Sequence, residues 1–335
     1  KTLVAPIIGG MKLVEKYKSN PIYEYICILN YLNKLSYDSA ITLAQIYSDK
    51  DQYYNLIARD TNFRLKDDSG VFNNSNFLKY FFRLFKEEGD EVIKTGIENN
   101  NALFLMTQKL ILTPKIIFDA FKKRLKFIHI VKHPIYVYEH WYSYLSRFNS
   151  FREYDLAFDY KGAKIPWYWN LENELFIKSS IEEKTILSII LIYEWLFKEL
   201  NKLEKNQSNN FCIISFEEVV FETEKILLKI SNFLNRDHHH NVKKILKKLK
   251  LPRQGLSPAH DKWSHEGSHS GYRMPVLYEF NKKNIENEDM YLQKIISNIF
   301  SNTKPSTKDQ YIKIIKTYQS LFPSKINDNV NKIII

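Results

Sequence analysis

Four short apolar runs constrain what this chain can fold into. They are KTLVAP (1–6), ALFLMT (102–107), KFIHIV (126–131) and FCIISF (211–216). Each run is continuous rather than alternating, which is typical of strands buried on both faces, and each precedes a helical pattern. Strands that alternate with helices predict an α/β fold in which a mostly parallel central sheet is flanked by helices, a three-layer sandwich.

The segments between these runs indicate amphipathic helices. In 171–205 one apolar stripe is formed by Ile186, Ile189, Ile190, Tyr193, Leu196 and Phe197. The strand signal ends near residue 276, and two helical patterns, 291–300 and 310–322, follow. We expect a main domain over 1–275 and a C-terminal helical extension over 276–335. Two short helices bury too little surface to fold alone, so the extension should pack on the main core.

The charge balance favours an anionic partner. Lys and Arg total 49 against 38 Asp and Glu, a net charge of +11, which suits a phosphorylated or sulfated small molecule, a nucleic acid or a lipid surface. No apolar run approaches the roughly 20 residues that a bilayer crossing needs, so no stable membrane span is expected. Two cysteines, both in apolar stretches, exclude a disulfide framework and favour a reducing, cytoplasmic location.

The first strand-to-helix turn carries Gly9, Gly10, Met11 and Lys12. Paired glycines let backbone N–H groups approach an oxyanion, a helix start adds a favourable dipole, and Lys12 adds a charge. The loop is therefore a candidate phosphate cradle. The alternative is an ordinary glycine-containing turn.

The second turn places Lys132 and His133 before Pro134, which fits the first position of a helix. A cation there can meet an anion resting on the helix start. His140 follows eight residues after Lys132 and reaches the same edge only if the helix tilts suitably. The alternative for His140 is a packing residue.

A third candidate loop consists of Arg253, Gln254 and Gly255, directly after the basic segment VKKILKKLK. Arginine is suited to bidentate recognition of phosphate. The alternative is a solvated helix end followed by a turn.

Together, the order and spacing of these segments resemble the PAPS-dependent sulfotransferase family. KFIHIVKHPIYVYEHWYSY is similar to that family's second motif, and FCIISFEEVVFETEKILLKISNFL to its third, with Phe216, Glu217 and Glu218 in the turn. RQG at 253–255 resembles the final loop, and ALFLMTQKLILTPKIIFDAF resembles the strand that carries the catalytic histidine. The resemblance covers roughly residues 1 to 265.

The resemblance implies a P-loop-like fold and transfer of a sulfuryl group from PAPS to a hydroxyl or amine, with PAP as product and no metal. The acceptor would be a small molecule or a glycan. Lys132 would take the place of the arginine that contacts the 3′-phosphate and His140 that of its partner serine. The segment Arg253–Gly255 and the loop Gly9–Lys12 would supply the remaining donor contacts.

Two positions depart from the family pattern. Ile7 stands where the family has the first-loop lysine, and Gln108 stands at the position of the catalytic histidine. Lys12 and His133 are the candidates for the catalytic roles, with Lys109 as a further substitute. These departures motivate an alternative function, a non-catalytic protein of the same fold that binds a nucleotide or an anionic partner.

The segment KGAKIPWYWN (161–170) is a candidate acceptor loop, since aromatic walls with cationic rims suit sugars or phenols. Its candidate contacts are Lys164, Trp167 and Trp169. The alternative is a loop that the two tryptophans anchor in the core.

Two further signals compete with this hypothesis. His265–His269 fits the pattern H-E-x-x-H of zinc hydrolases, but its glycines and serines predict a loop rather than the required helix. The run His238–His240 follows Asp237 at a predicted helix end, where adventitious metal affinity is the alternative, and no functional metal site is expected. The positive charge is scattered and no nucleic-acid-binding motif is present, so no nucleic-acid partner is expected.

Overall fold

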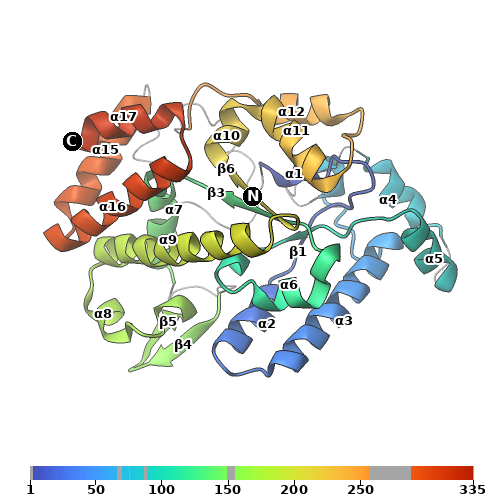
Figure 1. Cartoon of the computed structure of the whole chain (residues 1–335), viewed down its shortest axis with the longest axis horizontal. Helices are drawn as coiled ribbons and strands as arrows, with labels where there is room; N and C mark the ends of the chain where they lie inside the picture. Colours follow the sequence, from blue (N-terminus) through green and yellow to red (C-terminus); the bar gives the residue numbers. More distant parts are fainter. Residues whose placement is uncertain are drawn as a thin grey trace.

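The protein is an α/β molecule in which helices surround short, mostly parallel strands (Figure 1). The computed structural model describes residues 3–65, 70–74, 76–86, 89–148, 155–256 and 288–334. The described α-helices are α1 (Ala5–Ile8), α2 (Ile22–Tyr31), α3 (Tyr37–Leu56), α4 (Leu78–Arg83), α5 (Asp90–Glu98), α6 (Lys115–Phe121), α7 (Pro134–Ser146), α8 (Asn173–Lys178), α9 (Ile181–Asn206), α10 (Phe216–Phe221), α11 (Thr223–Leu234), α12 (Val242–Leu249), α15 (Glu288–Ser301), α16 (Pro305–Leu321) and α17 (Lys325–Ile334).

The described strands form three pairs. Strand β3 (Phe127–Val131) pairs in parallel with β6 (Phe211–Ser215), which confirms the strands predicted at 126–131 and 211–216. Strand β1 (Lys18–Ser19) pairs in parallel with β2 (Leu105–Met106), so the run 102–107 contributes only two residues of strand. Strands β4 (Ala157–Tyr160) and β5 (Ala163–Pro166) form an antiparallel hairpin. The extended central sheet that the sequence predicts is not among the described pairs.

The strand predicted at 1–6 is wrong where the chain is described. Residues Ala5–Ile8 form the short helix α1, in which Ile8 N donates to Val4 O at 3.1 Å and Gly9 N donates to Ala5 O at 2.9 Å. Pro6 lies in the first helical turn, where the missing N–H costs nothing and the fixed φ favours a helix. A short apolar run carries no period that separates a buried strand from a buried helix.

Helix α9 is in contact with both α7 and α16. It crosses the front of the view in Figure 1. The Ser180 hydroxyl caps its start by accepting from Glu183 N. Five of the six residues of its predicted stripe are buried: Ile186 and Ile189 fully, and Ile190, Tyr193 and Leu196 to at most 5% exposure. The sixth, Phe197, is half-buried. Helix α9 packs against α7, the helix that follows β3, and against α16.

The three C-terminal helices pack on this core. Side chains of α15, α16 and α17 belong to the main hydrophobic cluster, and α16 lies against α9 and α7. The Glu183 carboxylate adds a polar anchor, accepting from Lys304 N at 3.2 Å and from the Thr307 hydroxyl at 2.5 Å. The two predicted helices are present and α17 is a third. The predicted division at residue 275 lies outside the described residues.

Candidate functional site

The pair β3–β6 creates the site's framework, because both strands end at the same edge. Their register runs from Phe127 opposite Phe211 to Val131 opposite Ser215. Helix α7 begins three residues after β3, and α10 begins directly after β6. In parallel α/β sheets, ligands bind beyond the carboxyl ends of the strands. The chemistry-bearing residues that follow β3 and β6 therefore share one edge.

Lys132 lies at this edge, directly after β3. Its Nζ is 5.1 Å from the ring centroid of Phe216 and 5.8 Å from that of Tyr136, so the cation rests between the first turns of α10 and α7. The Tyr193 hydroxyl of α9 donates to Lys132 O, which fixes the backbone of this residue. The side chain is partly exposed and can meet an anion.

Glu217 is a buried residue of α10 whose carboxyl group lies beside His133, the residue before α7. Its Oε1 accepts from His133 N at 2.9 Å, and its Oε2 accepts from the Tyr318 hydroxyl at 2.6 Å. Burial raises the pKa of Glu217, and the two hydrogen bonds and the charge of Lys132 oppose that rise. A helix start attracts an anion, and here a side chain of the protein already supplies one.

His133 is completely buried between α7 and α16. Its Nδ1 accepts from Ile135 N at 3.3 Å, and its ring meets the edges of Tyr136 and Tyr318. Its Nε2 has no hydrogen-bond partner among the described residues. Burial, and then the charge of Lys132, lower the pKa of His133 to about 3, so the imidazole is neutral at ordinary pH. Neutrality suits a base, but the ring is 0% exposed.

The loop after α12 contacts the last turn of α10. Arg253 N donates to Val220 O at 2.9 Å, and Arg253 Nη2 donates to Leu249 O at 3.1 Å. Val220 lies one helical turn after Phe216, the residue beneath Lys132. Lys132 thus lies at the start of α10, and the backbone of Arg253 contacts the last turn of the same helix, while the Arg253 guanidinium donates to the end of α12. Gln254 is exposed and Gly255 is buried.

Glu288 at the start of α15 ties this loop to α7. Leu256 N donates to Glu288 Oε2 at 3.1 Å, and the Tyr136 hydroxyl donates to Glu288 Oε1. The sequence offered Glu288 only as a possible third ligand of the zinc motif at 265–269, and it gave no signal for Tyr318, because both come from the C-terminal helices with no local motif that points to this edge. The sequence predicts Glu217 in the turn after the strand 211–216. Its position two residues after Ser215 is the local signal that could have pointed to its role at this edge.

The loop Gly9–Lys12 is not part of this edge. Lys12 N donates to Asp237 O and His239 N donates to Gly10 O, both at 2.8 Å. Met11 and His238 form an isolated antiparallel β-bridge. These contacts involve residues just before α12, whereas Arg253 follows α12. The eight residues of that helix span about 12 Å, so the loop and Arg253 lie near its opposite ends. Lys12 Nζ itself pairs with Asp237 at 3.3 Å.

Gly9 has a packing role rather than a phosphate-binding one. A Cβ at Gly9 would lie 3.2 Å from Ala5 O and 3.3 Å from Asn74 Nδ2, and that amide nitrogen donates to Gly9 O at 3.0 Å. The chain's own groups therefore occupy the space around this glycine. The predicted phosphate cradle at 9–12 is not supported by this arrangement.

His140 lies on the exposed side of α7, about 9 Å along the helix from Pro134, and the structure does not bring it to Lys132. Gln108, at the position of the family's catalytic histidine, is exposed after β2. Its neighbour Lys109 pairs with Asp155 and lies 5.4 Å from the ring centroids of Trp141 and Tyr144. Lys109 is thus held in an aromatic enclosure away from the β3–β6 edge.

The burial of the two tryptophans in the candidate acceptor loop, 161–170, favours the alternative in which they anchor the loop in the core. Trp167 is 0% and Trp169 is 2% exposed. Trp169 Nε1 donates to Ser188 Oγ of α9 at 2.8 Å, and Trp167 packs against Tyr31 and Trp195. The structure places both indoles in the hydrophobic core rather than on a pocket wall. Lys164 is exposed on β5.

A groove of about 190 Å³ lies between α9, α11 and the end of α16. Lys229 is on its rim and donates to Ile213 O at 2.8 Å. Neither Lys132 nor Arg253 lines this groove. Among the described residues, no group of three His, Cys, Asp or Glu side chains is arranged to hold a metal ion; the motif at 265–269 lies outside them.

Comparison with known proteins leaves the family open. No protein-family model, no curated protein and no solved structure matches the chain. The resemblance to sulfotransferases is therefore one of sequence motifs alone.

Proposed function

We propose that this protein binds a phosphorylated nucleotide of the PAP type at the edge where β3 and β6 end. The supporting observation is that Lys132 and Arg253, 121 positions apart in the sequence, both contact α10, the first through Phe216 and the second through Val220. A ligand with two phosphate groups suits two cations at one strand edge. The net charge of +11 favours its approach.

The phosphates would bind the Lys132 ammonium and the Arg253 guanidinium rather than the start of α7. The Glu217 carboxyl group already accepts from the N–H of His133, the residue before α7, and so occupies the place that a phosphate oxygen would need there. Binding therefore depends on side chains more than on a backbone cradle. The loop Gly9–Lys12 lies at the other end of α12 and takes no part.

Sulfuryl transfer from PAPS to a hydroxyl or amine is the second candidate. A cation that stabilises charge on the bridging oxygen and a base for the acceptor proton would assist it. Neutral His133, next to Lys132, is the observation that favours transfer. Its complete burial, the pairing of Lys12 with Asp237, and Ile7 and Gln108 at the two departing positions favour binding without transfer.

Titration calorimetry with PAP tests the binding site. Lys132→Ala and Arg253→Ala should each weaken binding about tenfold, because each removes a charge-assisted contact to phosphate. Lys12→Ala is the matched control, an exposed lysine away from the edge, and should bind like the unaltered protein. Absence of binding at millimolar PAP, or equal loss in all three variants, would overturn the proposal.

A turnover assay with PAPS and a panel of phenol, alcohol, amine and sugar acceptors separates the two functions. Release of PAP that depends on an acceptor establishes transfer, and His133→Gln should then reduce it. Binding of PAP with no turnover on any acceptor supports the non-catalytic function.

A further inference from the structure

Helix α4 is inside out: its polar residues face the protein and its apolar residues face solvent. Tyr80 is 0% and Arg83 is 9% exposed, while Phe81 is 48% and Phe82 is 64% exposed. A surface helix of a globular protein normally shows the opposite arrangement. A cause within the fold must hold this orientation, and a use for the outward face must be sought.

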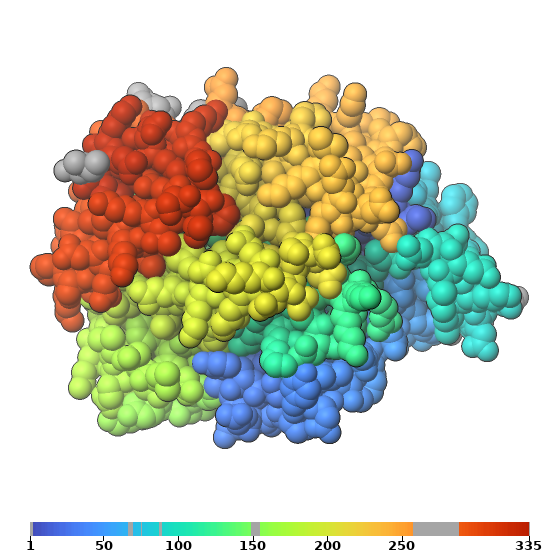
Figure 2. Space-filling view, in the orientation of Figure 1, coloured from blue at the N-terminus to red at the C-terminus, as the bar shows by residue number. Residues whose placement is uncertain are grey.

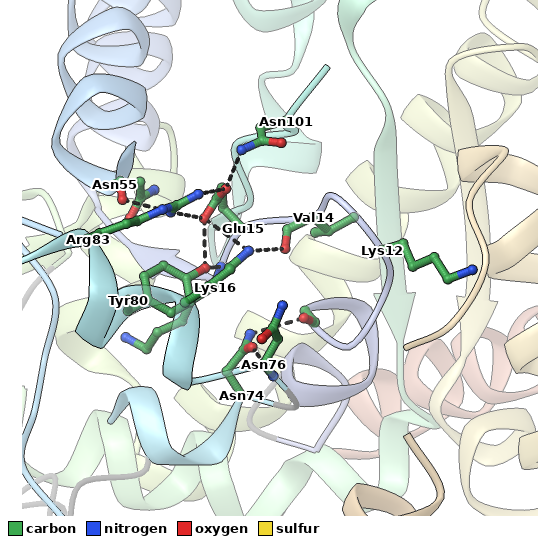
Figure 3. Close-up of polar contacts among 12 residues, drawn as sticks. Lys12, Val14, Glu15, Lys16, Asn55, Asn74, Asn76, Tyr80, Arg83 and Asn101 are labelled. Carbon is green, nitrogen blue, oxygen red and sulfur yellow. Dashed lines mark hydrogen bonds and ion pairs between the residues drawn. The ribbon is translucent and has the colours of Figure 1, made fainter. Parts of the chain in front are cut away.

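The cause is a buried cluster around Glu15, shown in Figure 3. Arg83 donates to both carboxylate oxygens, at 2.8 and 3.0 Å, and the Tyr80 hydroxyl donates to Oε2 at 2.7 Å. Lys79 Nζ lies 3.4 Å from the same oxygen. A bidentate arginine pair fixes direction as well as distance. With Tyr80 and Arg83 fixed inward, the residues between and beside them must point outward.

The outward residues include two groups of neighbouring rings, one on α4 and one just before it, which we call the phenylalanine patch. Ring centroids lie 5.6 Å apart for Phe72 and Phe77, 6.1 Å for Phe81 and Phe82, and 5.6 Å for Phe81 and Phe85. Exposed leucines extend the patch, and its members are Leu65, Phe72, Phe77, Leu78, Phe81, Phe82, Leu84 and Phe85. Exposed apolar surface of this kind marks an interaction site in soluble proteins.

A basic helix borders the patch. Helix α12 buries Val242, Ile245, Leu246 and Leu249 and exposes Lys243, Lys244, Lys247 and Lys248. Lys248 Nζ donates to Asn73 Oδ1 at 2.6 Å, and Asn73 adjoins Phe72. An exposed apolar surface and a row of four lysines therefore meet at one place. Figure 1 shows α4, α5 and α12 on the side of the molecule opposite α16, and Figure 2 shows that α16 end in red.

We propose that this surface docks the protein onto an anionic lipid bilayer, with the phenylalanine patch entering the interface and the α12 lysines contacting headgroups. Apolar insertion combined with basic residues is the pattern of peripheral membrane binding. Of the described helices, none has the length and apolar character needed to cross a bilayer, so the association is at the surface. A second copy docking through the same surface would bring two rows of lysines together, which charge repulsion disfavours.

Vesicle co-sedimentation with the full chain tests this proposal. Two vesicle types are compared, phosphatidylcholine alone and phosphatidylcholine with about one-third phosphatidylserine. The protein should sediment with the anionic vesicles, and added salt should weaken the binding because it screens the lysines. Sedimentation with both vesicle types alike would overturn the charge argument.

Two matched pairs of variants divide the apolar and basic contributions. Phe82→Ser with Phe85→Ser should weaken binding about tenfold or more, whereas Leu171→Ser, which changes a leucine that is 88% exposed beside α8, should not. Lys243→Ala with Lys247→Ala should weaken binding to the anionic vesicles about tenfold. Lys313→Ala with Lys316→Ala, on α16, removes the same charge and should have a much smaller effect.

Equal behaviour of variants and controls, or no sedimentation with anionic vesicles, overturns the proposal. A dimer in vesicle-free ultracentrifugation that Phe82→Ser with Phe85→Ser abolishes would assign the surface to a second copy instead. Thermal unfolding of each variant establishes that it folds. PAP affinity should not change in any of them, so failure here is distinct from failure of the nucleotide proposal.

Discussion

The carboxylate of Glu217 accepts a hydrogen bond from His133 N at 2.9 Å, so a residue of α10 occupies the anion position at the start of α7. The two residues follow the two paired strands, and the contact joins the carboxyl ends of β3 and β6 into one unit. Tyr318 adds the third member from α16. The C-terminal helices therefore contribute directly to the geometry of the candidate site.

Tyr318→Phe should destabilise the protein by about 2 kcal/mol, since it removes a hydrogen bond to a buried carboxylate. Tyr311→Phe is the matched control on the same helix, because the Tyr311 hydroxyl is buried with no hydrogen-bond partner among the described residues. Its expected change is near zero. Urea unfolding of both variants measures the difference, and equal stability of the two would contradict this account of α16.

His133 should make stability depend on pH. Its pKa is about 3 in the folded protein, against an ordinary value of 6.5. Below the ordinary value the unfolded chain binds a proton that the folded protein does not, so stability falls as pH drops from 6.5 toward 3, by up to about 1.4 kcal/mol per pH unit.

Urea unfolding of His133→Gln at a series of pH values checks this sign. The variant should lose that part of the decline, since no imidazole remains to charge in the unfolded chain. His140→Gln, on the exposed side of the same helix, retains His133 and should keep the decline. The same pH dependence in both variants would refute the assignment to His133.

Trp169 should act on stability rather than on ligand binding. Trp169→Phe removes the hydrogen bond to Ser188 and leaves a void, with an expected cost of about 2 to 3 kcal/mol. Ser188→Ala breaks the same bond, so the double variant should cost less than the sum. Unfolding measurements give the three values. If a fully folded Trp169→Phe variant showed a changed affinity for PAP or for an acceptor, Trp169 would be assigned to the binding site instead.

Local apolar patterns predicted the parts of the fold that do not depend on distant residues. The runs at 126–131 and 211–216 are five-residue strands, and five of the six stripe residues of α9 are buried as expected. The run at 1–6 misled because Pro6 and its apolar neighbours suit a buried helical turn as well as a strand. Sequence thus predicted the element types where length and period agreed.

The candidate site was predictable only in part. Lys132 and Arg253 follow a strand and a helix that the sequence predicts, and both lie at α10. The contacts of the Gly9 loop were not predictable, because its partners, Asn74 and Asp237–His239, come from distant segments that no local pattern connects to it. Tyr318 is 101 positions from Glu217. Such pairs are set by packing, which a single sequence does not encode locally.

Glu217→Gln should strengthen PAP binding by roughly tenfold, since it replaces the carboxyl group nearest to the proposed phosphate position with a neutral amide. The glutamine keeps an oxygen that can accept from His133 N or Tyr318, so the variant should fold with reduced stability. Glu98→Gln makes the same substitution at an exposed carboxylate on α5 and should change affinity much less. Calorimetry compares the three proteins at one ionic strength. If Glu217→Gln leaves the affinity unchanged while Lys132→Ala lowers it, the phosphate lies away from the start of α7, and Lys132 must reach it by extending toward solvent.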